Sequence, residues 1–166
     1  EHEVSLRSAE AILNNMNPDK YNIFPIGITK EGEWILFAGK DYAALVDGSW
    51  RNYADNKAAA LSPVRGQGLL IFEEGSVRTE KIDVVFPALH GENGEDGAMQ
   101  GLLQLAGIPC VGPAVSASAV SMDKTLTKLV LDDAGVPQAA WKLVKNSALT
   151  SRIDRILDEI EASFTY

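Results

Sequence analysis

The chain has 166 residues, 46% of them hydrophobic, which suits one domain or one domain with part of a second. Fifteen lysines and arginines stand against 23 aspartates and glutamates, so the formal net charge of −8 argues against a protein that grips nucleic acid phosphates. No apolar run approaches the roughly 18 residues of a membrane span, and we expect a cytoplasmic protein without membrane partners.

The first half of the chain predicts one helix and several short strands. A helix near the start of the chain, capped by Ser5 or Ser8, is predicted from the helical spacing of four apolar residues, which are Ala9, Ile12, Leu13 and Met16. Strands are expected over residues 21–28 and 34–37, with a turn between them. Residues 40–67 have no clear period and predict a loop with one helical turn, whereas residues 69–79 predict a hairpin around a turn at 73–75.

The apolar run from Val84 to Leu89 predicts a buried parallel strand, because it ends in a glycine-rich loop. A helix follows, with Gly107 as its C-cap and an apolar stripe of Met99, Leu102, Leu103 and Ala106. Residues 108–111 predict another short strand, in which Cys110 is expected as a buried thiol. Being the only cysteine, it excludes an internal disulfide. Strand, helix and strand in close order predict a right-handed parallel βαβ unit, and hence an α/β fold with a mainly parallel, Rossmann-like sheet flanked by helices.

The last third of the chain predicts three helices and a strand. Helices are expected from Ser116 and from Asp123, a strand over residues 139–144, and a final helix around residues 153–160 capped by Thr150 or Ser151. The chain opens on Glu1 without a methionine and closes on residues 163–166, which look like the start of a strand. We therefore expect a piece of a larger protein.

The strongest chemical signal is the loop His90-Gly91-Glu92-Asn93-Gly94-Glu95-Asp96-Gly97. A loop between a strand and a helix start collects unpaired backbone N–H groups, which with the helix dipole favour a carboxylate or a phosphate. His90, at the carboxyl end of the strand, can donate a hydrogen bond or accept a proton there. On shape alone, a structural turn with an exposed histidine is the alternative.

Two other charged positions are candidates for ligand binding. Lys124 lies in the first turn of its helix, where a cation opposes the dipole, so it suits a phosphate ligand unless Asp123 alone compensates. Glu1 and Glu3, at the start of the first helix, either complement its dipole or hold a substrate ammonium group. His2, between them, is expected to be a solvated terminal residue.

Three segments resemble the D-alanine–D-alanine ligases. In chain order they are Glu1-His2-Glu3-Val4-Ser5-Leu6, then His90-Gly91-x-x-Gly94-Glu95-Asp96-Gly97-x-Met99-Gln100-Gly101, then Ser121-Met122-Asp123-Lys124. The central segment fits the family's signature at every specified position, and Gly107-Ile108-Pro109 with Val111-Gly112 continues it. The resemblance covers nearly the whole chain and is weakest between residues 40 and 78.

The resemblance implies an ATP-grasp enzyme of peptidoglycan precursor synthesis that uses ATP and Mg²⁺. One D-alanine is activated as an acyl phosphate, and the amine of a second D-alanine attacks it. Residues 1–122 would form the N-terminal substrate-binding domain and residues 123–166 the beginning of the ATP-grasp domain. The metal ligands and most of the ATP site belong to parts of the family beyond this segment, so no metal ligand is expected here. The chain by itself is expected to be inactive, and a homodimer is expected from the family.

Site residues also follow from the resemblance. Glu1 would hold the ammonium of the first D-alanine, Val4 would line the same pocket, and His90 would bind the carboxyl group as charge develops. Gly91, with Gly94 and Gly97, would shape the loop, while Glu95 and Asp96 would support the helix start. Lys124 would contact a nucleotide phosphate. A ligase that joins D-alanine to D-serine or D-lactate, and a non-catalytic α/β ligand-binding domain, remain alternatives.

Overall fold

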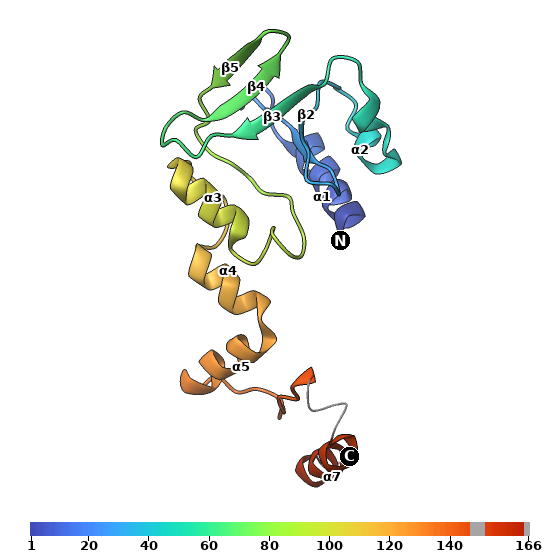
Figure 1. Ribbon diagram of the computed structural model, residues 1–166, viewed down its shortest axis with the longest axis vertical. Coiled ribbons are helices and arrows are strands. Elements are labelled where there is room, and N and C mark those ends of the chain that lie inside the picture. Colours follow the sequence, from blue (N-terminus) through green and yellow to red (C-terminus); the bar gives the residue numbers. More distant parts are fainter. Residues whose placement is uncertain (147–151, 165–166) are drawn as a thin grey trace. The chain divides into compact units, whose positions relative to one another are not determined.

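The computed structural model describes residues 1–146 and 152–164 and divides into two units, Glu1–Ala119 and Val120–Tyr166. The first unit opens with helix α1 (His2–Asn15) and the strands β1 (Ile26–Ile28) and β2 (Trp34–Leu36). Helix α2 (Ala43–Asp47) and a 3₁₀ turn (Ser49–Asn52) precede β3 (Lys57–Leu61), β4 (Leu69–Glu73) and β5 (Ser76–Glu80). Helix α3 (Ala98–Ala106) follows, and α4 (Val115–Met122) spans the division (Figure 1).

The five strands form one sheet in the order β1-β2-β3-β4-β5, and every neighbouring pair is antiparallel. The α/β class is confirmed, but the prediction of a mainly parallel, Rossmann-like sheet is wrong. Each strand pairs with the next one in sequence. The β1–β2, β3–β4 and β4–β5 connections are too short for the crossover that a parallel pair needs. The longer β2–β3 connection contains α2 and the 3₁₀ turn and also joins an antiparallel pair. The predicted hairpin is confirmed, since Glu73 pairs with Ser76 across a turn in which Gly75 has φ +75°.

The predicted strand Val84–Leu89 is reduced to one parallel bridge between Val85 and Cys110. The N–H of Val85 donates to the Pro109 carbonyl and the N–H of Val111 to the Val85 carbonyl, both at 2.9 Å. Helix α3 lies between the two segments in sequence, so the predicted strand–helix–strand order survives only as this bridge. Because pairing stops at a single residue, Val84 is 49% exposed rather than buried as predicted.

Other expected elements differ as well. Residues 40–67, expected to form a loop with one helical turn, contain helical structure in α2 and the 3₁₀ turn, and also strand β3, which was not expected. Residues 139–144, expected to form a strand, form none, since no described segment pairs with them. Helices α5 (Lys124–Asp133) and α7 (Ile153–Ser163) form as predicted, and the expected cap of the last helix at Thr150 or Ser151 falls outside the described residues.

The hydrophobic core of the first unit positions the loop that follows Leu89. Leu103 and Ala106, on the inner side of α3, are fully buried and pack with Ile108 against Val85, among other partly buried residues. The segments that enter and leave the loop are thereby tied to one cluster. A second cluster anchors α1, whose apolar side packs on the buried side chains of Phe37, Ala44, Leu45 and Trp50.

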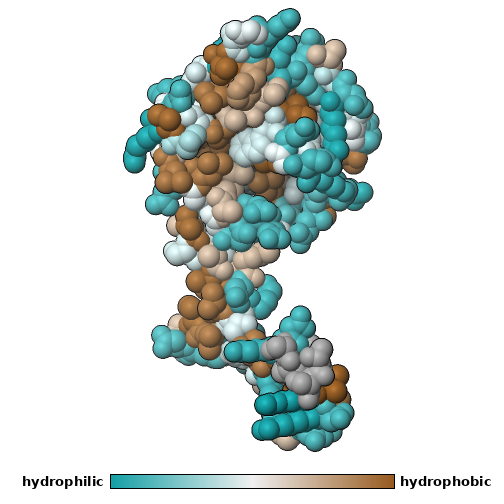
Figure 2. All heavy atoms as spheres, viewed as in Figure 1, coloured by the Kyte–Doolittle hydropathy of each residue, from teal (hydrophilic) through white to brown (hydrophobic). Residues whose placement is uncertain are grey.

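In the second unit, helix α5 has apolar side chains that are largely exposed. Leu126, Leu129 and Val130 are 44%, 51% and 52% exposed, and Figure 2 shows apolar side chains gathered over this helix. In the part of the chain that the structure describes, none of the helices has the length and apolar character to cross a membrane.

Candidate functional site

Helix α1 and the loop of residues 90–97 are joined by two serine hydroxyls. Ser5 Oγ accepts the backbone N–H of His90 at 2.9 Å, and Ser8 Oγ lies 2.8 Å from His90 Nε2. The expectation that Ser5 or Ser8 caps the helix is wrong, because the helix begins at His2 and both serines lie inside it. Their spacing of three residues places them on one face of α1. That face lies along the loop.

The carboxylate of Glu1 packs directly on Gly91. A Cβ atom added to Gly91 would overlap the Glu1 carboxyl group, whose most distant oxygen would lie only 2.9 Å away. Gly91 is buried and has φ +83°, a conformation that side-chain-bearing residues rarely adopt. The glycine is therefore needed for two reasons, its backbone conformation and the close approach of Glu1.

The loop is held together by its own carboxylates. Glu95 Oε2 accepts the N–H of Gly91 at 2.6 Å, and Asp96 accepts the N–H groups of Asn93 and Ala98 at 2.9 and 3.0 Å. The Ala98 and Asn93 N–H groups lower the pKa of Asp96 below its usual range. The expectation of unpaired N–H groups is thus wrong for Gly91, Asn93 and Ala98. An added anion would have to displace Glu95 or Asp96 to reach them.

Recognition at the loop therefore falls to side chains. The imidazole of His90 is about two-fifths exposed, and its Nδ1 lies 3.9 Å from Glu95 Oε1. The Glu1 carboxylate has no ion-pair or hydrogen-bond partner within residues 1–146 and 152–164. The Glu1 carboxylate on Gly91 is an acceptor for an ammonium group, and the imidazole of His90, the preceding loop residue, can donate to a carboxyl group. A small zwitterion carries both groups.

The neighbouring residues of α1 have different surroundings. Glu3 pairs with Lys30, which lowers the pKa of the Glu3 carboxyl to about 2, so this carboxylate is already engaged. Val4, one helical turn after Glu1, is 52% exposed. His2 is not the solvated residue that the sequence suggested, because its Nε2 lies 3.0 Å from the Ile28 carbonyl oxygen.

Lys124 belongs to the second unit, where it is the first residue of α5 and is exposed. Asp123 is the N-cap of this helix and accepts the N–H groups of Thr125 and Leu126 at 2.8 and 3.1 Å. Asp123 thus caps the start of α5, as expected in the alternative in which Asp123 alone compensates the helix dipole. The Lys124 ammonium group remains in solvent.

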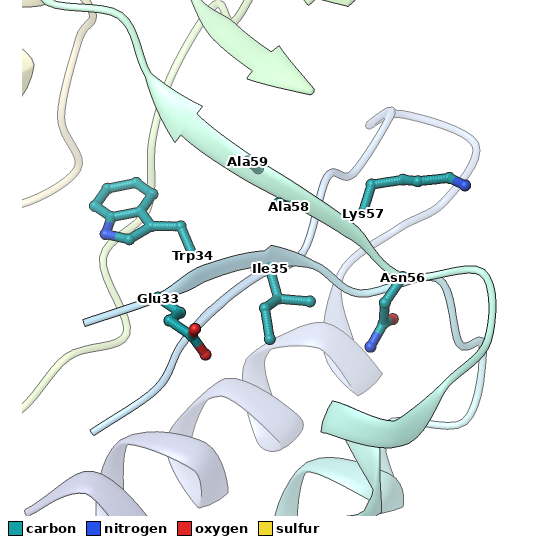
Figure 3. A pocket seen from close by; sticks show the side chains of 7 residues that line it. All are labelled: Glu33, Trp34, Ile35, Asn56, Lys57, Ala58 and Ala59. Carbon is teal, nitrogen blue, oxygen red and sulfur yellow. The ribbon is translucent and has the colours of Figure 1, made fainter. Parts of the chain in front are cut away.

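A depression of about 440 Å³ lies elsewhere in the first unit, between β2 and β3. It is lined by Glu33, Trp34, Ile35, Asn56, Lys57, Ala58 and Ala59, none of which is a predicted site residue. In Figure 3, Trp34 and Lys57 point to one side of the two strands, and Glu33, Ile35 and Asn56 point to the other. The side chains do not converge on one point, as strand alternation requires. This depression supports no ligand site.

Sequence reasoning missed Ser5 and Ser8 as partners of His90. The usable signal was their spacing of three residues within a helix that begins at His2, with Glu1 rather than a serine at the N-cap position. The partner itself is 82 residues away from Ser8, and no local pattern indicates it.

Comparisons with known proteins place the chain in a family. The family model described as "D-ala D-ala ligase N-terminus" matches residues 1–113. A D-alanine–D-alanine ligase from Caldicellulosiruptor bescii is 41% identical over the full chain and 45% of its own length. A D-alanine–D-alanine ligase from Thermoanaerobacter sp. strain X514 is 47% identical over 87% of the chain and 40% of its own length. The chain thus spans less than half of these relatives.

Solved structures agree with this assignment. The VanG D-Ala:D-Ser ligase from Enterococcus faecalis has a TM-score of 0.81 and 37% identity, covering 99% of this chain and 46% of its own. The D-alanine–D-alanine ligase from Coxiella burnetii has a TM-score of 0.78 and 34% identity, covering 96% of this chain and 46% of its own.

Proposed function

Because this chain belongs to the D-alanine–D-alanine ligase family as an N-terminal part, we propose that it binds the first D-alanine in an ATP-dependent ligase of peptidoglycan precursor synthesis. The observation that carries the proposal is the Glu1 carboxylate packed on Gly91, the residue that directly follows His90 in the loop. The Glu1 carboxylate is an acceptor for the substrate ammonium, and the His90 imidazole is a donor for its carboxyl group.

Each site residue has a defined task in this proposal. Glu1 binds and orients the D-alanine ammonium, and Val4 supplies apolar surface beside it. His90 binds the carboxyl group and stabilises negative charge as it develops there, which is where a fixed donor accelerates acyl transfer. Gly91 allows the substrate and the Glu1 carboxylate to approach the backbone closely.

ATP supplies the phosphoryl group that activates the carboxylate. Among the described residues, Lys124 is suited to a nucleotide phosphate, since it is exposed on the first turn of α5 and its charge is not consumed by capping. One lysine does not make a nucleotide site. Within the same residues, no group of three histidine, cysteine, aspartate or glutamate side chains could hold a metal ion. We assign Mg²⁺ no ligand among these residues.

Further parts of the proposal concern the protein as a whole. Residues 1–122 would form the substrate-binding domain and residues 123–166 the start of the ATP-grasp domain, in a cytoplasmic homodimer. The second substrate is D-alanine in this proposal, as in the names of the curated relatives. D-serine is the second candidate, because the VanG ligase matches with a TM-score of 0.81.

The test is a product assay on the complete ligase with D-alanine alone and with D-serine or D-lactate added. We expect D-alanyl-D-alanine, and we expect Glu1→Gln and His90→Ala to impair its formation, with Glu1→Gln acting mainly through the KM for D-alanine. The 166-residue chain alone should show no D-alanine-dependent ATP hydrolysis. Wild-type kinetics in both variants would refute the assigned roles, and a complete protein without ligase activity would favour a non-catalytic ligand-binding domain.

A further inference from the structure

The ring of His90 is held by a residue that the proposed function does not use. Ser8 Oγ lies 2.8 Å from His90 Nε2, and no other hydrogen bond of that hydroxyl occurs in the described residues. The main chain of His90 is fixed separately, through its N–H to Ser5 Oγ. The two serines therefore contact different parts of His90. Ser5 holds the backbone, and Ser8 contacts only the ring.

The second ring nitrogen faces a carboxylate. Glu95 Oε1 lies 3.9 Å from Nδ1, too far for a hydrogen bond but close enough to favour a proton on that nitrogen. Glu95 is itself kept in place by the N–H of Gly91 at 2.6 Å. The negative charge beside Nδ1 is thus a fixed part of the loop.

A neutral imidazole bears its proton on one nitrogen only. If Glu95 keeps that proton on Nδ1, Nε2 bears a lone pair and can only accept a hydrogen bond. The Ser8 hydroxyl can rotate to donate to it. The opposite arrangement, with Nε2–H donating to Ser8, would place the Nδ1 lone pair against the Glu95 carboxylate, which is unfavourable.

We propose that Ser8 is a positioning residue: by donating to His90 Nε2 it holds the ring with Nδ1 beside Glu95, and the charge of Glu95 keeps the neutral ring in its Nδ1–H tautomer. This inference rests on the proposed function in one respect, that His90 serves the D-alanine carboxyl group. Nδ1–H is then the donor that remains for a ligand, because it has no hydrogen-bond partner among the described residues. Without Ser8, the ring would be free to turn away from Glu95. Part of the population would then bear its proton on Nε2 and present no donor at Nδ1.

The chain supplies an internal reference, since it has only two histidines. His2 Nε2 lies 3.0 Å from the Ile28 carbonyl oxygen, which can only accept, so His2 must be the Nε2–H tautomer. The two rings are therefore expected to show opposite tautomers in one spectrum. The His2 signal also reports whether α1 still packs on β1 in each variant.

The experiment is long-range ¹H–¹⁵N correlation spectroscopy of the imidazoles in the 166-residue chain, read at the alkaline end of their titration. His2→Gln assigns the signals. We expect His90 as Nδ1–H in the wild type and a shift toward the other tautomer of roughly 2- to 10-fold in Ser8→Ala, the range that one hydrogen bond contributes. Ser8→Thr, which keeps the hydroxyl, should restore the wild-type pattern. Ser116→Ala, at an exposed helical position, should leave both signals unchanged.

Two results would overturn the inference: His90 as Nε2–H in the wild type, or an unchanged tautomer in Ser8→Ala. The wild-type spectrum decides the first even if Ser8→Ala does not fold. Kinetics of the complete ligase separate this inference from the proposed function. If His90→Ala leaves the KM and kcat for D-alanine unaltered, the proposed function fails while the tautomer result stands. If His90 matters, Ser8→Ala should raise the KM for D-alanine several-fold and Ser8→Thr should not.

Discussion

Substituting Gly91 by alanine separates backbone strain from loss of the proposed ammonium site. Gly91 has φ +83°, and its added Cβ would overlap the Glu1 carboxyl group. Gly75 has φ +75° with no atom within 4 Å of an added Cβ, so Gly75→Ala is a matched control for strain alone. A non-glycine residue in this conformation costs about 1–2 kcal/mol.

The two variants should lose similar stability, because the obstacle at Gly91 is the movable end of a side chain. At roughly 2–4 °C per kcal/mol for a domain of this size, each melting temperature should fall by about 2–8 °C. The kinetics should differ. A hydrogen bond to a charged group contributes about 1.5–3 kcal/mol, so displacing Glu1 should raise the KM for D-alanine by about 10- to 150-fold in Gly91→Ala. Gly75→Ala should leave that KM unchanged.

The assay is steady-state kinetics of the complete ligase with D-alanine varied, alongside thermal unfolding of both variants. Combining Gly91→Ala with Glu1→Gln tests whether Gly91→Ala acts by displacing Glu1, because the free-energy effects of two substitutions in one interaction do not add. In the Glu1→Gln background, Gly91→Ala should add little to the KM. If the KM for D-alanine is equal in Gly91→Ala and Gly75→Ala, the Glu1 carboxylate that packs on Gly91 does not bind the substrate ammonium group.

Three further predictions concern other parts of the chain. Gly27→Ala should destabilise the first unit by about 1–3 kcal/mol in denaturant unfolding, because a Cβ there would lie 2.6 and 3.0 Å from ring atoms of the fully buried Trp50. The pKa of Asp96 is lowered in the folded state. Its contribution to the free energy of unfolding is therefore present above the pKa of the unfolded state and is lost as the pH falls through the pKa of the folded state. The melting-temperature difference between wild type and Asp96→Asn should therefore be constant above about pH 5 and shrink in more acid solution. Lys124→Ala should raise the KM for ATP in the complete ligase, and unchanged ATP kinetics would remove this residue from the site.

The parts of the fold that the sequence predicted are those decided by local patterns. The β4–β5 hairpin and helix α3 follow from apolar periodicity bounded by glycines, and Gly107 ends α3 with φ +70° as a C-cap should. Strand β3 was missed because three of its five residues are alanine, which has little preference for strands. Its pairing with both β2 and β4 forms it instead.

The failures have a common physical cause, which is that strand pairing depends on neighbours that the strand's own sequence does not describe. The run from Val84 to Leu89 is as apolar as a buried strand, yet only Val85 finds a partner. The candidate site shows the same division. His90 and Gly91 were found from one local motif, whereas the role of Glu1 at the same D-alanine site was expected only from the family resemblance. Ser8 was expected as a helix cap and not as a partner of His90.

The internal hydrogen bonds of the loop determine which ligands its glycines and the start of helix α3 can bind. A glycine loop before a helix binds anions only while its N–H groups are free. Here Glu95 and Asp96 occupy those of Gly91, Asn93 and Ala98, so none of these three donors is free for a phosphate. The same carboxylates make the surroundings favourable for an ammonium group, and Glu1 strengthens that preference. Phosphate recognition is then left to cationic side chains such as Lys124, while the loop is suited to the amino acid.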